Sequence, residues 1–163
     1  MSVSPEAFRA ALGDWASGVT IVTSRHGDVI HGMTVSAFAS VSLEPPLVLV
    51  CADQGSETHG VIAASGVFGV NVLTQAQRAL SDKFAAAKDE HRRFEGVAWS
   101  AAPTGVPLLD EALVSLDCRV EVAHEAGDHV IYVGLVEAIE RRDGDPLLYY
   151  RGGYRTLAAP EGS

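Results

Sequence analysis

The sequence predicts a mainly β fold, an antiparallel barrel with a few short helices at its rim. About six or seven segments alternate apolar and polar residues or are rich in β-branched side chains, whereas only two or three short segments have helical periodicity. Strands do not alternate with helices, which argues against the βαβ units of a parallel sheet. We expect one domain over residues 1–163, with an N-terminal helix over about 4–17, a barrel over about 18–157 and a short polar C-terminal tail.

Composition and charge limit the possible classes of function. The chain is 47% hydrophobic and 20% charged, as expected for a soluble globular protein. Its net charge of −9 argues against binding a nucleic acid polymer, which requires clustered Lys and Arg. Neither a signal peptide nor an apolar stretch of membrane-spanning length is visible, so we expect no membrane contact and a cytoplasmic location. Cys51 and Cys118 are isolated and no metal-ligand spacing occurs, so we expect two reduced thiols and no metal site.

Capping signals and periodicity predict the first helix and strand. Ser4 and Pro5 are typical of a helix start, because a hydroxyl caps a free backbone N–H and proline fits the first turn. Apolar residues then recur on one helical face at Phe8, Ala11, Leu12 and Trp15. Gly18 ends this helix, and the β-branched segment 19–24 predicts a strand.

The stretch 31–53 carries the pattern around which the chain is organised. Small hydroxyl residues recur between apolar ones, so an extended chain would place one face of hydroxyls at Thr34, Ser36, Ser40 and Ser42. Gly32 beside this row would let the polar edge or phosphate of a ligand approach the backbone. Residues 44–46, Glu-Pro-Pro, break the alternating pattern, because proline removes a backbone donor. Residues 47–50 predict a buried strand, and this strand is expected to end with residues 51–53 at the mouth of the barrel. The alternative is an ordinary hairpin with small residues for packing.

The rest of the chain gives shorter signals. We predict helices over 57–64 and 75–87, and strands over 67–73, 113–122, 129–139 and 147–150. Residues 124–129 indicate a hairpin between two of these strands. The charged segment 89–93 is expected to be exposed, and 94–110 to be loop.

Few residues point directly to chemistry. The motifs G-x-S-x-G, HExxH and G-x-G-x-x-G are lacking, which argues against a serine hydrolase, a zinc protease and a Rossmann site. Gly127-Asp128-His129 would project an imidazole beside the barrel mouth; the alternative is an ordinary turn. Tyr149, Tyr150 and Tyr154 could stack on an aromatic ligand or be half-buried packing. Three basic residues could hold a phosphate, or they could simply be solvated: Lys83, Arg92 and Arg93.

Several segments together resemble the short-chain flavin reductase family, which includes the reductase components of two-component flavin-dependent monooxygenases. The segments are FRAALGDWASGVTIVTS, HGMTVSAFASVSLEPPLVLVC, SGVFGVNVL, LSDKFA, GVPLLDEALVSLDCRV, AGDHVIYVGLVE and PLLYYRGGYRTL. They follow one another in order from Phe8 to Leu157. The resemblance implies a split antiparallel β-barrel that binds FMN or FAD, forms a homodimer and oxidises NADH or NADPH, with a monooxygenase component as possible recipient of the reduced flavin. The alternative is a flavin-binding split barrel without NAD(P)H turnover.

The resemblance also implies site residues. Those expected to bind the flavin are Met33, Thr34, Val35, Ser36, Ser40, Cys51, Ala52, Asp53, Thr58, Lys83 and Phe84. Those expected to bind NAD(P)H are Gly127, Asp128, His129 and Tyr154, with His129 as the residue of the catalytic step. Ser36 departs from the family, where relatives often have Asn, and a hydroxyl lacks the paired donor and acceptor of an amide.

The implied mechanism is hydride transfer from nicotinamide C4 to flavin N5, with the hard chemistry supplied by the cofactor. The protein would stack the two rings at roughly 3–3.5 Å and stabilise charge at the pyrimidine end with backbone N–H groups. His129 would chiefly position NAD(P)H, and no essential proton-transfer residue is expected.

Overall fold

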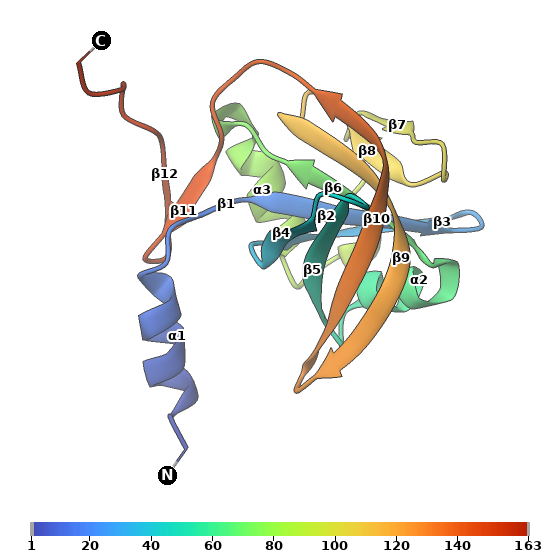
Figure 1. The fold of residues 1–163 in the computed structure, drawn as a ribbon, viewed down its shortest axis with the longest axis horizontal. Helices are drawn as coiled ribbons and strands as arrows, with labels where there is room; N and C mark the ends of the chain where they lie inside the picture. Colours follow the sequence, from blue (N-terminus) through green and yellow to red (C-terminus); the bar gives the residue numbers. More distant parts are fainter. Residues whose placement is uncertain (1, 163) are drawn as a thin grey trace.

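The computed structural model describes residues 2–162, and its largest unit is a seven-stranded antiparallel sheet (Figure 1). In order across the sheet the strands are β3 (Val29–Val35), β2 (Thr20–His26), β6 (Val67–Val72), β9 (Val114–Ala126), β10 (His129–Arg141), β5 (Leu47–Asp53) and β4 (Phe38–Ser42). The chain therefore passes from one edge of the sheet to the other through residues 36–37 alone. So short a link requires the sheet to curl until its two edges approach, which confirms the predicted antiparallel barrel.

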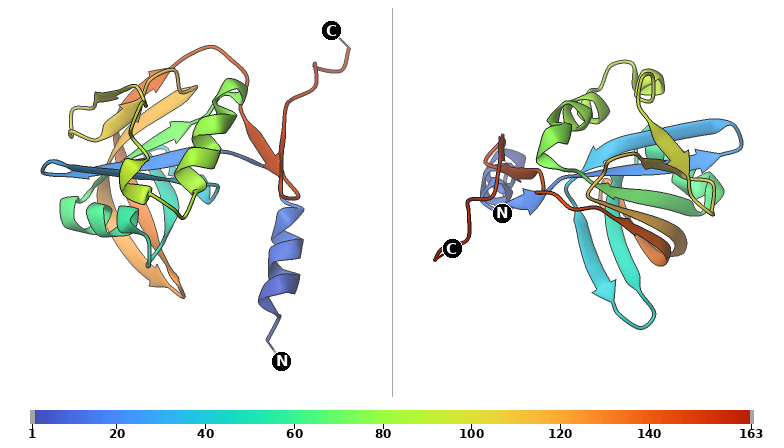
Figure 2. Two further views of the ribbon diagram at one scale, coloured as in Figure 1. Left: turned by 180° about the vertical axis from the view of Figure 1, so that it is seen from behind. Right: turned by 90° about the horizontal axis from the view of Figure 1, so that it is seen from above.

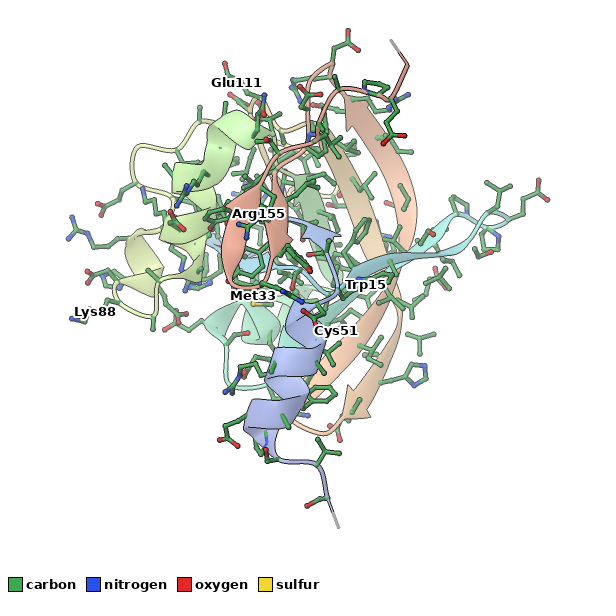
Figure 3. The ribbon with its side chains drawn as sticks, turned by 90° about the vertical axis from the view of Figure 1, so that its left-hand side faces the viewer. Trp15, Met33, Cys51, Lys88, Glu111 and Arg155 are labelled. Atoms are coloured by element: carbon green, nitrogen blue, oxygen red, sulfur yellow. The ribbon has the colours of Figure 1, made fainter. Side chains whose placement is uncertain are left out.

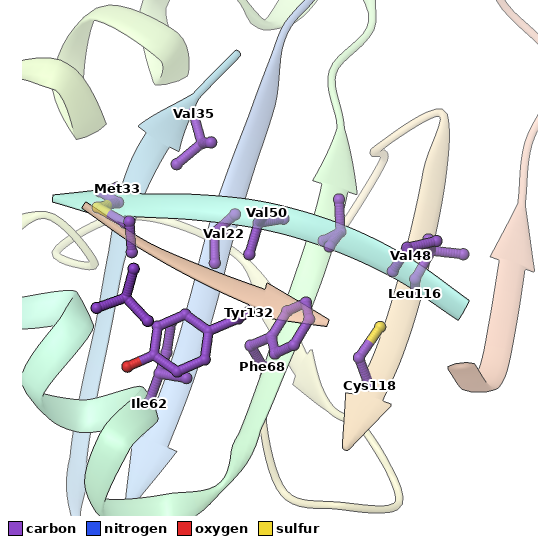
Figure 4. Packing of buried hydrophobic residues seen from close by; sticks show 13 residues of the cluster. Val22, Met33, Val35, Val48, Val50, Ile62, Phe68, Leu116, Cys118 and Tyr132 are labelled. Carbon is purple, nitrogen blue, oxygen red and sulfur yellow. The ribbon is translucent and has the colours of Figure 1, made fainter. Parts of the chain in front are cut away.

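One apolar cluster fills the interior of this barrel (Figure 4). Val22, Val50 and Phe68 face one another there and are fully buried. Gly134 on β10 makes room for the largest of these side chains, because a Cβ at this position would lie 2.5 Å from Cζ of Phe68. The close packing explains why β10 carries a glycine within an otherwise β-branched run.

The N-terminal helix is shorter than expected and stands away from the barrel (Figure 1). Helix α1 (Pro5–Gly13) begins as predicted, with the N–H of Ala7 donating to Oγ of Ser4 at 3.2 Å. It ends at Gly13, because the chain then turns into the two-residue strand β1 (Ser17–Gly18), so Trp15 lies beyond the helix. No residue of α1 is buried, and Trp15 is 76% exposed.

Strand β1 belongs to a small sheet at the same end of the molecule. It pairs with β11 (Leu148–Tyr150), which pairs in turn with β12 (Gly153–Arg155). Figure 2 shows this sheet beside α1, apart from the seven-stranded sheet. All three tyrosines identified in the sequence lie in this sheet. The rings of two of them, Tyr149 and Tyr154, meet edge to face with their centroids 5.5 Å apart.

The expected single row of hydroxyls in 31–53 is wrong, because this stretch is not one continuous strand. It breaks at Ser36-Ala37, and a register shift between Ser40 and Ser42 marks a bulge in β4. Thr34 and Ser40 therefore lie on opposite edge strands of the sheet. Strand β5 is also not uniformly buried: Val48, Val50 and Ala52 face the core, whereas the residues between them are half-buried.

The peripheral helices occur where the sequence predicts helices, with different bounds. Helix α2 (Glu57–Ser65) is capped by Ser56 and ends at Gly66, whose φ of 71° closes the last turn. The second predicted helix is divided into a 3-10 turn, η1 (Gln75–Gln77), and helix α3 (Arg78–Ala85). Among the described residues no helix is long and apolar enough to cross a membrane.

The segment 89–110 differs most from expectation. A 3-10 turn, η2 (Glu90–Arg92), lies in the part predicted only to be exposed. A short hairpin of β7 (Trp99–Ala101) and β8 (Pro107–Leu109) lies where loop was predicted. The whole of β8 is buried. Arg93 is also buried, not exposed, because its guanidinium donates to the carbonyl oxygens of Gly32 at 2.9 Å and Ala86 at 2.7 Å.

The hairpin predicted around 124–129 is confirmed. Strands β9 and β10 extend further than expected and meet at a two-residue turn, Gly127-Asp128. The φ of Gly127 is 66°, a left-handed conformation in which glycine carries no steric penalty.

Candidate functional site

A cavity of about 490 Å³ opens between α3, the end of β3 and the C-terminal hairpin. Its volume lies within the range of small-molecule and cofactor sites. Polar side chains line it from three parts of the chain: Thr34, Ser36, Arg78, Ser81, Asp82 and Tyr154. Backbone at Gly152 and Gly153 forms a further part of the wall, so a ligand can approach the main chain there.

Tyr154 is the centre of the polar network in this cavity. Its hydroxyl donates to Oδ1 of Asp82 at 2.6 Å and lies 2.8 Å from Oγ of Ser81. The guanidinium of Arg78 covers the Tyr154 ring at 4.7 Å from the centroid. Burial and, second, the hydrogen bond with Asp82 raise the pKa of Tyr154, so the phenol stays protonated at neutral pH. The network therefore holds the Tyr154 hydroxyl, whose proton is used by Asp82, and a stacked cation in fixed positions.

The end of β3 is fastened to α3 by a side-chain hydrogen bond. Oγ1 of Thr34 donates to the carbonyl oxygen of Ser81 at 2.7 Å. Because this bond uses the Thr34 proton, the hydroxyl presents only acceptor lone pairs to a ligand. Ser36 is exposed at the cavity, and no described hydrogen bond uses its side chain.

A second depression of about 470 Å³ continues from the first towards α1. The two share Ser36 and Tyr149 in their walls. Leu12 and Trp15 line the second depression with Leu49 of β5, and Figure 3 looks onto this side of the molecule, with Trp15 beside the C-terminal hairpin. The hollow thus runs from a polar end at α3 to an apolar end at α1.

The structure brings residues 51–53 and 127–129 together at the end of the barrel. His129 lies opposite Asp53 in the ladder of β10 and β5, and Ile131 lies opposite Cys51. The N–H of Gln54 donates to the carbonyl oxygen of Asp128 at 3.0 Å, which joins the two segments beyond the strands. These two groups were assigned to flavin and nicotinamide respectively, and adjacency of the two is what hydride transfer between their ligands requires.

His129 is available to a ligand from one side of its ring. Its Nδ1 lies 2.7 Å from Oδ1 of Asp128, and its side chain is 43% exposed. The hydrogen bond with His129 lowers the pKa of Asp128, so the carboxylate persists and fixes the ring. Nε2 then remains for a ligand.

Residues 51–53 connect to the first cavity through the link between the edge strands. The N–H of Cys51 donates to the carbonyl oxygen of Ala37 at 3.1 Å, so the backbone of the half-buried Cys51 lies beside the link at 36–37. Burial raises the pKa of the Cys51 thiol, which keeps it neutral. The sequence-predicted residues Thr34, Ser36 and Cys51 are therefore neighbours in space.

Other predicted flavin ligands have packing roles in the structure. The side chains of Met33, Val35 and Ala52 lie in the barrel core, and Thr58 and Phe84 are fully buried. Oγ1 of Thr58 pairs with Nδ1 of His31 at 2.8 Å. In these five residues only backbone atoms can contact a ligand, because the side chains are buried.

The prediction that Gly32 leaves room for a ligand is wrong. A Cβ at this position would lie 2.9 Å from Cε1 of Phe84. The space beside Gly32 is thus already filled by an aromatic ring of α3, which corrects the expected role of this glycine.

Lys83 and Ser40 lie apart from the first cavity. Lys83 donates to the carbonyl oxygen of Glu95 and lines a separate depression of about 290 Å³ with Lys88 and Arg92. Ser40 is exposed on the edge strand β4.

Sequence reasoning missed three cavity residues, Arg78, Ser81 and Asp82. In the sequence, the charged Arg78 and Asp82 and the small Ser81 look like solvated residues of a helix surface. The available signal is their spacing, since residues three and four apart on a helix share one face.

Taken together, the fold and this arrangement define a split-barrel protein with a cofactor-sized hollow where its two edge strands meet. The family model described as flavin reductase like domain matches residues 12–158, and the chain belongs to this family.

Individual relatives agree in sequence and in structure. The chain is 46% identical over 158 residues to the NADH-dependent flavin reductase of a Rhodococcus species, covering 95% of this chain and 88% of the relative. It is 41% identical over 156 residues to the reductase component of 4-hydroxyphenylacetate 3-monooxygenase from Thermus thermophilus, covering 95% and 98%. A solved structure of the NADH:FAD oxidoreductase of Streptomyces globisporus, in complex with NAD and FAD fragments, matches with a TM-score of 0.89 and 33% identity, covering 100% of this chain and 99% of that chain.

Proposed function

We propose that this protein is an NAD(P)H-dependent flavin reductase that transfers hydride from nicotinamide to FMN or FAD and supplies the reduced flavin to a partner monooxygenase. The observation that carries the proposal is the convergence of three segments, 34–36, 51–53 and 127–129, at one end of the split barrel. The names of the relatives support the same activity.

The residues at the hollow fit a flavin. Its polar end offers hydroxyl acceptors, a fixed phenol and backbone of Gly152 and Gly153, which suit a ring edge with alternating donors and acceptors. Its other end is apolar and suits a planar ring face. A bound flavin supplies the hydride-accepting chemistry, and the chain orients it.

The chain's own groups then have distinct tasks. Ser36 and the backbone at 34–36 and 51–53 hold the flavin edge. His129, fixed by Asp128, would hold and orient the nicotinamide, which would supply the hydride to the bound flavin. Leu12, Trp15 and Leu49 offer the flavin ring an apolar wall.

A homodimer is part of this proposal. Phe8, Leu12 and Trp15, on and just beyond α1, are 60%, 52% and 76% exposed. Exposed apolar residues gathered in one region are typical of an interface between copies. Light scattering should give twice the chain mass, and Leu12→Glu with Trp15→Glu should give a monomer. A wild-type monomer at all concentrations would contradict the dimer.

We further propose that residues 1–163 act as one flavin reductase-like domain in the cytoplasm, where a reducing environment suits the two free thiols.

The experiment that tests the activity measures NADH and NADPH oxidation separately, in the presence of FMN or FAD, by loss of the nicotinamide absorbance band. Turnover that depends on both flavin and protein is expected. Flavin binding without oxidation of either nucleotide would instead establish the alternative, a flavin-binding split barrel without turnover.

A further inference from the structure

Three elements far apart in the sequence meet on the side of β3 that faces α2 and η2. His31 of β3, Glu57 in the first turn of α2 and Glu90 of η2 each place one nitrogen or oxygen atom within 4.8 Å of the others. Nε2 of His31 lies 2.8 Å from Oε2 of Glu57. The histidine is 4% exposed, so this imidazole is held in the interior with carboxylates at its free edge.

Two atoms of this cluster lack hydrogen-bond partners. Among the buried side-chain nitrogen and oxygen atoms of residues 2–162, those without a partner are Nε2 of His31, Oε2 of Glu90 and Nε of Arg93. The approach of Glu57 to Nε2 is close but lacks hydrogen-bond geometry. Buried polar groups are otherwise nearly always paired, so two unpartnered atoms in one cluster, Nε2 of His31 and Oε2 of Glu90, indicate a site for a further polar ligand. Nε of Arg93 is an N–H donor and is not a ligand for a cation.

We infer that His31, Glu57 and Glu90 bind a first-row divalent transition-metal cation of the Zn²⁺ type. One imidazole and two carboxylates form a mixed nitrogen and oxygen donor set that Zn²⁺ accepts, whereas Mg²⁺ and Ca²⁺ prefer oxygen alone. The remaining coordination position is left for water, as in three-ligand sites.

The surroundings orient the ligands as metal sites require. Nδ1 of His31 pairs with Oγ1 of Thr58 at 2.8 Å, which fixes the ring and directs Nε2 into the cluster. Nη2 of Arg93 lies 3.5 Å from Oε1 of Glu90, which leaves Oε2 to the cation. Two carboxylates outweigh the single guanidinium, so the cluster attracts a dication.

The position assigns the cation a structural role. It joins β3 to α2 and η2 immediately before Gly32 and Thr34, and so it steadies the strand end that forms the first cavity. The inference stands on these residues alone and does not depend on the proposed reductase activity.

The test is direct binding of the metal alone to chelator-treated, redialysed full-length protein. Titration with Zn²⁺ against a chromophoric chelator, and with Co²⁺ followed by its visible absorption, should show one tight site per chain. Because changes in orienting residues alone cost about 10–100-fold in affinity, loss of a ligand in Glu57→Gln or Glu90→Gln should weaken binding at least about tenfold. Glu95→Gln, an exposed acid near the same turn that pairs with Arg92, is the matched control and should bind as wild type does.

Several results would overturn the inference. These are no binding to wild type, equal affinity for Mg²⁺, or Zn²⁺ binding unaffected by both variants, which would place the metal elsewhere. The glutamine variants keep the side-chain volume, and circular dichroism checks that they fold. Melting temperature gives a second readout, since Zn²⁺ should raise it in wild type and Glu95→Gln but not in Glu57→Gln or Glu90→Gln.

Discussion

His129, the first residue of β10, lies directly opposite Asp53, the last residue of β5, in the antiparallel ladder. The pairing places the residue assigned to nicotinamide beside the segment assigned to flavin, while the Asp128 carboxylate holds the imidazole from the solvent side. A short ladder of backbone hydrogen bonds, not a flexible loop, thus sets the separation of the two groups.

Replacement of His129 by Ala should impair the nicotinamide and leave the flavin unaffected. If the ring contributes equally to ground-state and transition-state binding, the KM for NAD(P)H rises with little change in kcat. If it also aligns the nicotinamide, kcat falls too, since small misplacements can cost on the order of 100-fold. Flavin titration and steady-state kinetics with NAD(P)H varied measure both effects. Lost flavin affinity with normal NAD(P)H kinetics would reverse the assignment, and no change in either would make His129 an ordinary turn residue.

Replacement of Ser36 by Leu should weaken flavin binding. The side chain is exposed at both depressions, so a branched apolar group there would obstruct the hollow. It would also remove the proposed hydrogen bond between Ser36 and the flavin, which costs about 0.5–1.5 kcal/mol. Fluorescence titration with FMN and FAD measures the change. Ser100→Leu on β7, exposed and outside both depressions, is the control. Equal flavin affinity in folded Ser36→Leu and wild type would refute the assignment.

Arg93 should matter for stability far more than its neighbour Arg92. Arg93→Met would leave the buried carbonyl oxygen of Gly32 without this donor, at about 1–3 kcal/mol. It would also remove the bond to Ala86, an exposed residue whose carbonyl oxygen water can reach. Arg92→Met removes only an exposed ion pair with Glu95 and should change stability little. Urea unfolding of the two variants gives the comparison, and similar midpoints would show that Arg93 is not a structural anchor.

The two thiols should differ in reactivity. Burial, with a smaller contribution from Asp117, raises the pKa of Cys118 from 9.0 to about 12, so native Cys118 should resist alkylation at pH 8. Cys51 is half-buried, has a raised pKa, and should react slowly and be protected by flavin. Mass spectrometry of iodoacetamide-treated protein distinguishes the two sites. Rapid native labelling of Cys118 would contradict the burial seen here.

The same shift gives an alkaline pH dependence. The unfolded chain loses the Cys118 proton near pH 9.0, whereas the folded chain keeps it to about 12. The unfolded state therefore binds fewer protons in this interval, so the contribution of Cys118 to stability is present below pH 9 and falls as pH rises towards 12. Between pH 9 and 12 the free energy of unfolding should fall more steeply with pH for wild type than for Cys118→Ala. Urea unfolding of both proteins at several pH values in this range measures the two slopes.

Local signals in the sequence predicted several of the secondary-structure elements. The Ser4 cap, the Gly127-Asp128 turn and the helix after Ser56 depend on neighbours within a few residues, and the structure has them where the sequence indicates. The antiparallel barrel followed from the absence of any alternation of strands and helices. Segment resemblance, rather than spacing, supplied the family.

What could not be predicted depends on contacts between distant segments. Arg93 reads as a surface charge until the carbonyl of Gly32, far away in sequence, is known to need a donor. The hydroxyl residues of 34–42 were predicted to share one face of a strand, because nothing in the sequence near Ser36 shows that the chain passes there from one edge of the sheet to the other. Likewise, His31, Glu57 and Glu90 have no recognisable spacing, since folding alone brings them together.

The two-residue link at Ser36-Ala37 has a consequence for how this site can vary. Its main chain hydrogen-bonds to Phe38 and Cys51 through carbonyl oxygens, and both of its side chains are exposed. Side chains at these two positions can therefore be exchanged without removing a ladder bond or a core contact. This part of the wall, which we propose contacts the flavin, is thus little constrained by folding, and we expect changes there to alter cofactor preference while the barrel itself stays intact.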